Sequence, residues 1–427
     1  VLFGLVPAWQ AARADLRDAL AQGGRAGSAR GGRVRAALIV GEFALTCVLL
    51  IGAGLMLRTL SNLHAADPGY STERVVAFNW ALPTEGYSEA AQRIAVVDRA
   101  LERVRRLPGV VHTGLITPLL LTGGGHQSSY YVEGAPEPEV GRHPSTETFR
   151  IAGETLGLLE MPLIMGRTFD ARDQAESPRV AIVDTRFVER NFGADVNPLG
   201  RRFAFGGTRP KDEKAFMEIV GVVPHIQNYG LGRDTREQVY LPYTQSTPSS
   251  MTFLLRTTQD STAWGPILAQ AMREVVPDLP VFGVLTMDEL FQRSIGTQRL
   301  TVVLLGTFAG LALLLAAVGL YGVLSTTVGQ RTREIGVRLA LGATTRSVLA
   351  LIVNHGLRLA ALGIMIGAAV ALAATKLLGS VLYGVSATDP ITFAIVLLAL
   401  LTIGVVSCWL PARRATRVDP MVALRAD

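Results

Sequence analysis

The 427-residue chain has few charged residues and few cysteines. Only 18% of its residues are charged, against about 25% in an ordinary soluble domain, while 49% are hydrophobic. So high an apolar fraction excludes a disordered chain, and two cysteines are too few for a disulfide-rich scaffold. We expect Cys47 and Cys408, which lie within apolar runs, to be unbonded packing residues. This composition indicates a membrane protein.

Lysine is almost missing, and its scarcity excludes one chemistry directly. The chain contains only Lys211, Lys214 and Lys376, so nearly all of its basic residues are arginine. A P-loop needs a Gly-Lys-Ser/Thr sequence so that the ammonium group reaches the nucleotide phosphates, and no Gly-Lys pair occurs. These residues therefore form no P-loop ATPase, and we expect this chain to bind no cofactor.

Four apolar stretches are long enough to cross a bilayer, which takes about 20 residues of helix. They predict transmembrane helices over residues 36–59, 299–327, 348–375 and 391–411. A buried helix of a soluble domain rarely stays apolar all round over such lengths. The predicted fold class is an α-helical membrane protein. It has four transmembrane helices and a large extracytoplasmic α+β domain inserted between the first and the second.

Charge is divided unevenly along the chain. Residues 60–298 contain 23 basic and 28 acidic residues, whereas the rest of the chain contains 18 basic and 7 acidic residues. The basic excess lies in the segments 1–35, 328–347 and 412–427. The positive-inside rule places these segments in the cytoplasm, and it places residues 60–298 and the loop 376–390 outside. Because the positive-inside rule already accounts for the basic segments, their charge does not indicate a nucleic-acid partner.

The two ends of the chain resemble each other. Residues 7–15 read PAWQAARAD and align with residues 411–419, PARRATRVD, at a constant offset of 404 positions. Each copy follows an apolar stretch. We interpret residues 1–35 as the tail of a preceding module of the same kind, followed by a cytoplasmic linker. A chance likeness between two Arg- and Ala-rich membrane-exit segments is the alternative.

The region 60–298 is long enough to bury a core of its own. Apolar residues at helical spacing predict a helix over residues 88–107, and strand patterns alternate with helical patterns along the region. A strand–helix–strand unit lies near each edge, with a β-rich insert between them at about 150–245. This alternation predicts an α+β domain.

The same region shows no catalytic or metal-binding pattern. Its sequence contains no His-Glu-x-x-His pair, no Cys/His metal spacing and no Gly-x-Ser-x-Gly elbow. Asp170, Asp173 and Glu176 are spaced loosely like a calcium loop but lack the glycine and distal glutamate of an EF-hand, so we interpret them as a solvated turn. We expect a non-catalytic chain without a metal site.

Polar residues and glycine pairs within the predicted spans are further candidates. Ionisable residues inside a membrane are functional candidates by default, although those near helix ends often extend to the lipid headgroups. Both interpretations stay open for Glu42, His355 and Arg358. The glycine pairs at 306–310 and 363–367 allow close helix approach, either within one module or between two copies.

The most distinctive motif follows the second predicted span. Residues 333–343 read REIGVRLALGA, which predicts a short amphipathic helix. A Glu-Arg pair four residues apart supports this helix, and Gly342 would end it. Such a helix can lie on the membrane or fit a groove of a partner protein, and the residues alone leave both open.

These motifs together resemble the FtsX-like ABC transporter permeases of the MacB type. The run at 333–343 is the most specific, and GRTFD at 166–170, RVAIVD at 179–184 and PARRA at 411–415 agree with it. The resemblance covers residues 36–427. The repeat at the two ends also resembles the tandem-duplicated subgroup called acidobacterial duplicated orphan permeases.

The resemblance implies partners and a location. It implies a non-catalytic permease subunit in the bacterial inner membrane, with a periplasmic domain made of a porter-like α/β part and a β-rich insert. A cytoplasmic ABC ATPase that uses ATP and Mg²⁺ would drive it, and a preceding permease module or a second copy would pair with it. The ATPase contact maps onto Arg333, Glu334, Ile335, Gly336, Val337, Arg338, Ala340, Leu341, Gly342 and Ala343.

The function implied by the resemblance is to couple ATP hydrolysis by the partner to movement of the periplasmic domain, for export or mechanotransmission. The alternative is a membrane sensor with an extracytoplasmic ligand-binding domain. The two additional spans after the segment 328–347, and the lack of a cytoplasmic signalling domain, argue against a sensor.

Overall fold

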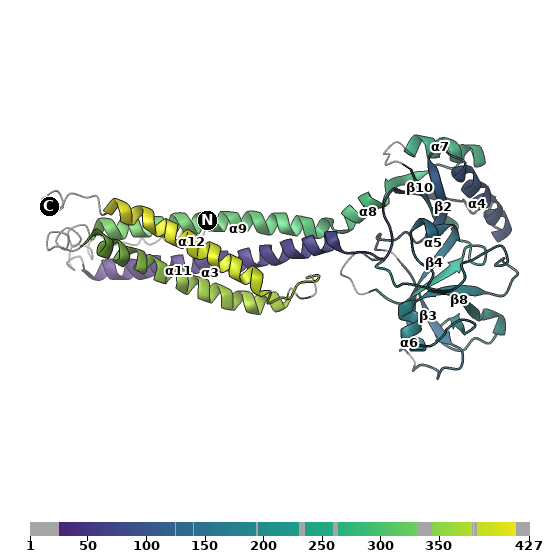
Figure 1. Ribbon diagram of the computed structural model, residues 1–427, viewed down its shortest axis with the longest axis horizontal. Coiled ribbons are helices and arrows are strands. Elements are labelled where there is room, and N and C mark those ends of the chain that lie inside the picture. Colours follow the sequence, from purple (N-terminus) through teal and green to yellow (C-terminus); the bar gives the residue numbers. More distant parts are fainter. Residues whose placement is uncertain are drawn as a thin grey trace. The chain divides into compact units, whose positions relative to one another are not determined.

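The computed structural model describes residues 25–415 apart from 124, 140, 194, 230–234, 259–263, 331–343, 378 and 380–381. The chain divides into two compact units. One comprises Val1–Asn62 and Gln298–Asp427, and the other comprises Leu63–Thr297. The first is a bundle of long helices, which we call the helical unit, and the second is built on a mixed sheet, which we call the head (Figure 1).

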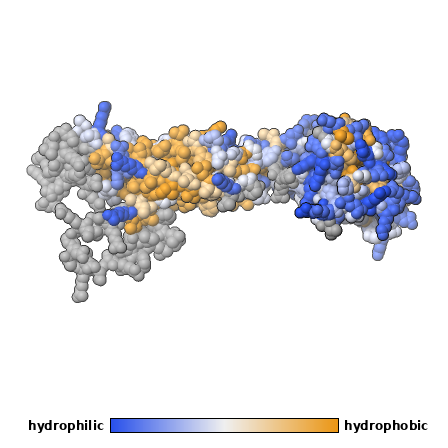
Figure 2. All heavy atoms as spheres, turned by 90° about the horizontal axis from the view of Figure 1, so that it is seen from below, coloured by the Kyte–Doolittle hydropathy of each residue, from blue (hydrophilic) through white to orange (hydrophobic). Residues whose placement is uncertain are grey.

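Four long helices make up the described part of the helical unit. They are α3 (Arg25–Ala65), α9 (Gly296–Gln330), α11 (Thr345–Leu377) and α12 (Pro390–Ala415). Each contains an apolar stretch long enough to cross a bilayer. Figure 2 shows mostly hydrophobic residues on the surface of this unit and mostly hydrophilic residues on the head. The predicted four-span fold class, with the α+β domain between the first and second spans, is confirmed.

Small residues let the helices of the bundle pack closely. A Cβ atom added at Gly363 of α11 would lie 2.7 Å from the Val40 carbonyl oxygen of α3, and one at Gly367 would lie 2.6 Å from the Ala44 carbonyl oxygen. This glycine pair therefore packs two helices of the same chain. Among the described residues, a Cβ atom at Gly306 or Gly310 of α9 would meet nothing within 4 Å.

A mixed sheet runs through the head. Its strands pair in the order β11-β1-β10-β2-β4-β3-β7-β8-β6-β9, and β5 pairs with β8. The strands are β1 (Val75–Ala81), β2 (Val110–Thr117), β3 (His126–Val132), β4 (Ser145–Gly153), β5 (Met165–Gly166), β6 (Val180–Asp184), β7 (Arg202–Phe205), β8 (Met217–Val223), β9 (Gln238–Pro242), β10 (Ser250–Thr257) and β11 (Phe282–Thr286).

Short helices cover the sheet. They are α4 (Ala90–Arg105), α5 (Thr155–Leu158), α6 (Thr185–Asn191), α7 (Trp264–Val275), α8 (Met287–Ser294) and the 3-10 turn η1 (Glu213–Ala215). Figure 1 shows α4 and α7 side by side next to β2 and β10. On α4, the apolar positions Val97 and Val104 are buried, as its helical spacing predicts.

The described residues of the head form two large hydrophobic cores, one in each lobe, and a small cluster of Tyr131, Ala204 and Phe216. The first lobe comprises β1, β2, β10, β11, α4, α5 and α7, and its core includes the stacked rings of Phe78 and Phe253, whose centroids lie 5.0 Å apart. The second lobe comprises β3, β5 to β9 and α6, with Tyr130, Phe187 and Phe203 at its centre. Strand β4 joins the lobes, because it pairs antiparallel with β2 and parallel with β9.

Candidate functional site

The residues expected to contact an ATPase, 333–343, lie outside the described residues. The structure describes the helices on either side of this segment. Helix α9 ends at Gln330 and helix α11 begins at Thr345. The segment therefore connects two spans of the bundle directly.

Of the three polar candidates in the spans, Glu42 is half-buried against another helix. A Cβ atom added at Gly319 of α9 would lie 2.6 Å from Glu42 Oε2, so the carboxylate of α3 occupies the space that this glycine leaves. His355 and Arg358 are both exposed on α11. The structure thus places Glu42 between two helices and the other two at the surface of the bundle.

An ion pair joins α3 to the start of α12. Arg58 of α3 donates to the Asp389 carboxylate, which also accepts hydrogen bonds from the Thr392 backbone N–H at 2.9 Å and the Thr392 hydroxyl at 2.5 Å. Nearby, the Asn62 side-chain amide donates to the Gly384 carbonyl oxygen at 3.0 Å. The hydrogen bonds from Thr392, followed by that from Arg58, lower the pKa of Asp389 to about 2. We call these contacts the α3–α12 clamp.

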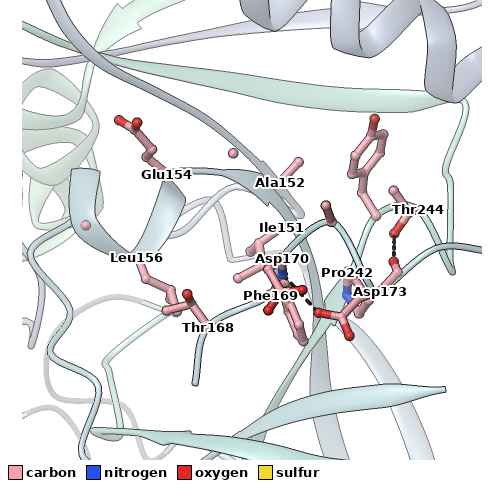
Figure 3. Close-up of a pocket in the computed structure, with 14 residues that line it drawn as sticks. Ile151, Ala152, Glu154, Leu156, Thr168, Phe169, Asp170, Asp173, Pro242 and Thr244 are labelled. Atoms are coloured by element: carbon pink, nitrogen blue, oxygen red, sulfur yellow. Dashed lines mark hydrogen bonds between the residues drawn. The ribbon is translucent and has the colours of Figure 1, made fainter. Parts of the chain in front are cut away.

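The head contains a pocket of about 510 Å³ where the two lobes meet (Figure 3). It is lined by the end of β4, by helix α5, by the loop 168–173 and by residues 242–244 at the end of β9. Its lining includes the apolar residues Ile151, Ala152, Leu156, Phe169, Ala171 and Pro242. We call it the interlobe pocket.

Ion pairs fix the loop on one side of the interlobe pocket. The Arg167 guanidinium donates to both carboxylate oxygens of Asp173, at 2.7 and 2.8 Å, and this contact lowers the pKa of Asp173. Asp170 accepts a hydrogen bond from Arg172 at 2.7 Å. Because Asp173 is only 3% exposed, the expectation of a solvated turn is wrong for this residue, whereas Asp170 and Glu176 are exposed. Both carboxylates already have arginine partners, so they form an ion-paired turn.

The other side of the pocket is held by contacts within the first lobe. Glu154, the residue before α5, lies 2.5 Å from the Nδ1 atom of His112 and 3.4 Å from the guanidinium of Arg105. The Tyr243 hydroxyl donates to Asp98 of α4 at 2.5 Å. Burial is the main cause that raises the pKa of Tyr243. These contacts pair residues that lie far apart in the sequence, so sequence patterns could not identify them.

A second polar cluster lies inside the second lobe. The Asp184 carboxylate lies 2.5 Å from His225 Nδ1, and His225 Nε2 lies 2.5 Å from the Thr235 hydroxyl. This order resembles a catalytic triad, although Thr235 is only 3% exposed. Asp184 also accepts from the Phe187 backbone N–H at 2.8 Å and caps α6, and burial raises its pKa. The cluster holds the lobe together.

Known proteins match this chain in both units. The family model described as MacB-like periplasmic core domain matches residues 36–271, and the one described as FtsX-like permease C-terminal matches residues 306–420. The chain is similar to the macrolide export ATP-binding/permease protein MacB 1 of Aeromonas hydrophila, with 26% identity over 408 residues that cover 91% of this chain and 57% of that protein.

Another relative is the pyoverdine export ATP-binding/permease protein PvdT of Pseudomonas putida. It is 24% identical over 405 residues, which cover 91% of this chain and 56% of that protein. The chain thus spans little more than half the length of these curated relatives. Among solved structures, the periplasmic region of MacB from Actinobacillus actinomycetemcomitans is 15% identical, has a TM-score of 0.35, and covers 55% of this chain and 97% of that one.

Proposed function

The chain belongs to the FtsX-like permeases that carry a MacB-like periplasmic core domain, and from this premise we propose that it is the membrane subunit of an ABC exporter. The observation that carries the proposal is that the family models match both the helical unit and the head. The subunit is non-catalytic, and a partner ABC ATPase binds and hydrolyses ATP with Mg²⁺. The absence of a Gly-Lys pair in these 427 residues supports this division of labour.

The ATPase contacts residues 333–343 on the cytoplasmic side, and it favours one of two arrangements of the bundle by contacting them differently. The positions of the neighbouring helices support this route. A shift of the segment acts on α9 and α11, because it joins them. Helix α11 then acts on α3 through Gly363 and Gly367. Helices α3 and α9 are the elements that precede and follow the head in the chain.

The protein lies in the bacterial inner membrane, with both ends in the cytoplasm and residues 60–298 in the periplasm. The unequal charge of the two parts supports this orientation. A preceding permease module in the same polypeptide, or a second copy, completes the transporter. The repeat between residues 7–15 and 411–419 supports a preceding module.

Reconstitution with an ATPase tests the coupling role. The full chain would be placed in proteoliposomes with a purified ABC ATPase from the same genome whose hydrolysis rate it stimulates. We expect Glu334→Lys and Gly336→Pro to abolish both retention of the ATPase and stimulation, because they change the charge and the backbone of the contact segment. Glu139→Lys, an equal charge reversal on an exposed residue of the head, serves as the control and should retain both.

Each variant must first insert into the membrane and elute like the parent chain. If correctly inserted Glu334→Lys and Gly336→Pro variants retain and stimulate the ATPase as the parent does, the coupling role of residues 333–343 is wrong. If no ABC ATPase of the genome is stimulated by the parent chain, the alternative of a membrane sensor is favoured.

A further inference from the structure

One face of α3 near its C-terminal end contacts the start of α12 and the loop before it. Gly54, Arg58 and Asn62 are spaced four residues apart, which places them on the same side of the helix. A Cβ atom added at Gly54 would lie 2.7 Å from Thr392 Cγ2, so the Thr392 methyl group occupies the space that this glycine leaves. Arg58 and Asn62 then make the polar contacts of the α3–α12 clamp. This face therefore holds α3 against α12 over about two helical turns.

The packing of α3 differs along its length. At residues 40–44, Gly363 and Gly367 of α11 lie so near its carbonyl oxygens that no side chain fits between the helices. At the clamp, by contrast, the Arg58 side chain is 43% exposed, and the hydrogen bond from Asn62 is exposed as well. Polar groups that reach water exchange partners at little net cost. Helix α3 is thus held by close packing at residues 40–44 and by easily exchanged contacts at the clamp.

Thr59, the residue after Arg58, is buried with its hydroxyl unpaired. It is 0% exposed, and its hydroxyl has no hydrogen-bond partner among the residues that the structure describes. A buried hydroxyl without a partner costs free energy, and an arrangement that admits water to this turn of α3 removes that cost. The closed clamp is therefore locally destabilised in the arrangement that the structure shows.

We propose that the α3–α12 clamp opens and closes as the ATPase works, with the close packing of Gly54 on Thr392 as the pivot. This inference rests on the proposed function, because it assigns the closed clamp to one of the two arrangements of the bundle. The closed clamp holds the end of α3, the helix from which the chain enters the head. When Arg58 and Asn62 release their partners, this end moves away from α12 while residues 40–44 stay packed on α11.

A disulfide across the clamp tests whether it opens. A Cβ atom added at Gly384 would lie 3.6 Å from the Asn62 Cβ atom, within the range of about 3.5–4.5 Å that a disulfide requires. The double variant Asn62→Cys with Gly384→Cys would be oxidised in proteoliposomes together with the ATPase that the parent chain stimulates. We expect oxidation to abolish stimulation while the ATPase stays bound, and we expect reduction with dithiothreitol to restore it.

The single variants Asn62→Cys and Gly384→Cys are the matched controls. Each carries one of the two changes, including a side chain at a residue whose φ is 62°, and neither forms the disulfide. Both should stimulate the ATPase to the same extent with and without oxidant. Full stimulation by the double variant, with its disulfide verified by mass spectrometry, would overturn the proposal, because the clamp would then stay closed throughout the cycle.

Spin labels examine the clamp without an ATPase. Nitroxides on Ser61→Cys of α3 and Ile391→Cys of α12, both exposed residues, would report the distance between the two helices in the full chain in nanodiscs. We expect Arg58→Gln, which removes the charge that pairs with Asp389, to increase the population of a second, longer distance. Arg58→Lys keeps the charge and should match the parent. Arg99→Gln, which removes an exposed charge from α4, should match it too.

The spin-label comparison keeps the clamp testable even if the coupling role fails. If the parent chain stimulates no ABC ATPase of the genome, the proposed function is wrong, and the distance distributions still show whether the clamp opens. Identical distributions in Arg58→Gln and the parent would overturn the proposal, because the ion pair would then not hold the two helices together.

Discussion

Asp389 is a single residue that stabilises two elements of the helical unit. It precedes Pro390, the first residue of α12, and its carboxylate accepts the Thr392 backbone N–H, as an N-cap residue does. The same carboxylate pairs with Arg58 of α3. Arg58 is 43% exposed and Asp389 is 12% exposed, so the ion pair is only partly shielded from water. We therefore expect the cap to contribute more to stability than the ion pair.

Two substitutions at Asp389 separate the cap from the ion pair. Asp389→Asn keeps a good N-cap but removes the charge, so we expect it to lower the free energy of unfolding by about 0–1 kcal/mol. Asp389→Ala removes both contacts, and we expect a loss of about 1–2 kcal/mol from the cap alone. Unfolding of the full chain in nanodiscs would measure both. Equal stability of the alanine variant and the parent would show that the clamp does not stabilise the bundle.

The pH dependence of the same clamp has a definite sign. The pKa of Asp389 is lowered from an ordinary value of 3.8 to about 2, so its contribution to stability is present above pH 3.8 and is lost as the pH falls toward 2. We expect the difference in unfolding midpoint between the parent and Asp389→Asn to shrink over this interval. A difference that stays constant from pH 5 to about 2 would contradict a depressed pKa.

Sequence patterns identify such residues by type but not by partner. The pair Arg58 and Asp389 is separated by 331 positions, and nothing local in either segment indicates the other. Asp173 illustrates the same limit, because its acidic neighbours suggest a solvated turn while Arg167 and the surrounding chain bury it. Glu42 was identified as a candidate from its place in an apolar run, but its contact with Gly319 depends on helix packing.

At the scale of elements, helix α11 packs closely against neighbouring helices at its glycine residues. At Gly363 and Gly367 the backbone of α3 lies so near that a side chain would collide with carbonyl oxygens. Gly356 of the same helix leaves room for the Cys408 sulfur atom of α12, since a Cβ atom there would lie 2.5 Å from it. Helix α11 therefore fits against two helices through small residues.

Enlarging these glycines should separate α11 from α3. We expect Gly367→Leu to destabilise the bundle by about 1–3 kcal/mol, the usual cost of overpacking, and to reduce stimulation of the ATPase. Gly306→Leu is the matched control, because a Cβ atom at Gly306 meets nothing within 4 Å among the described residues. Unfolding midpoints in nanodiscs provide the comparison. If Gly367→Leu is as stable as the control, the close packing of α3 and α11 is wrong.

Elements defined by local periodicity were predictable, and those defined by distant pairing were not. The apolar runs predicted the four long helices because a membrane-spanning helix needs only length and apolar residues. The helix expected over 88–107 is α4, Ala90–Arg105. The strand order of the head and the role of β4 in joining two lobes follow from pairings across the chain, which no local pattern specifies. The interlobe pocket depends on those pairings.

At the scale of the whole molecule, the proposed orientation places the head and residues 333–343 on opposite sides of the membrane. The parent cysteines Cys47 and Cys408 are both unbonded and fully buried in the bundle, so they should react slowly with a thiol reagent. Labelling of a cysteine introduced at an exposed position therefore shows on which side of the membrane that position lies. Glu139 in the head is suitable because its side chain is 78% exposed.

Labelling of intact spheroplasts with a membrane-impermeant maleimide tests this orientation. We expect Glu139→Cys to be labelled from outside, because the less basic region 60–298 is translocated while the basic segments stay in the cytoplasm. Arg338→Cys should be labelled only after the membrane is permeabilised. Labelling of Arg338→Cys but not Glu139→Cys in intact spheroplasts would invert the topology, and an ATPase in the cytoplasm could then not reach residues 333–343.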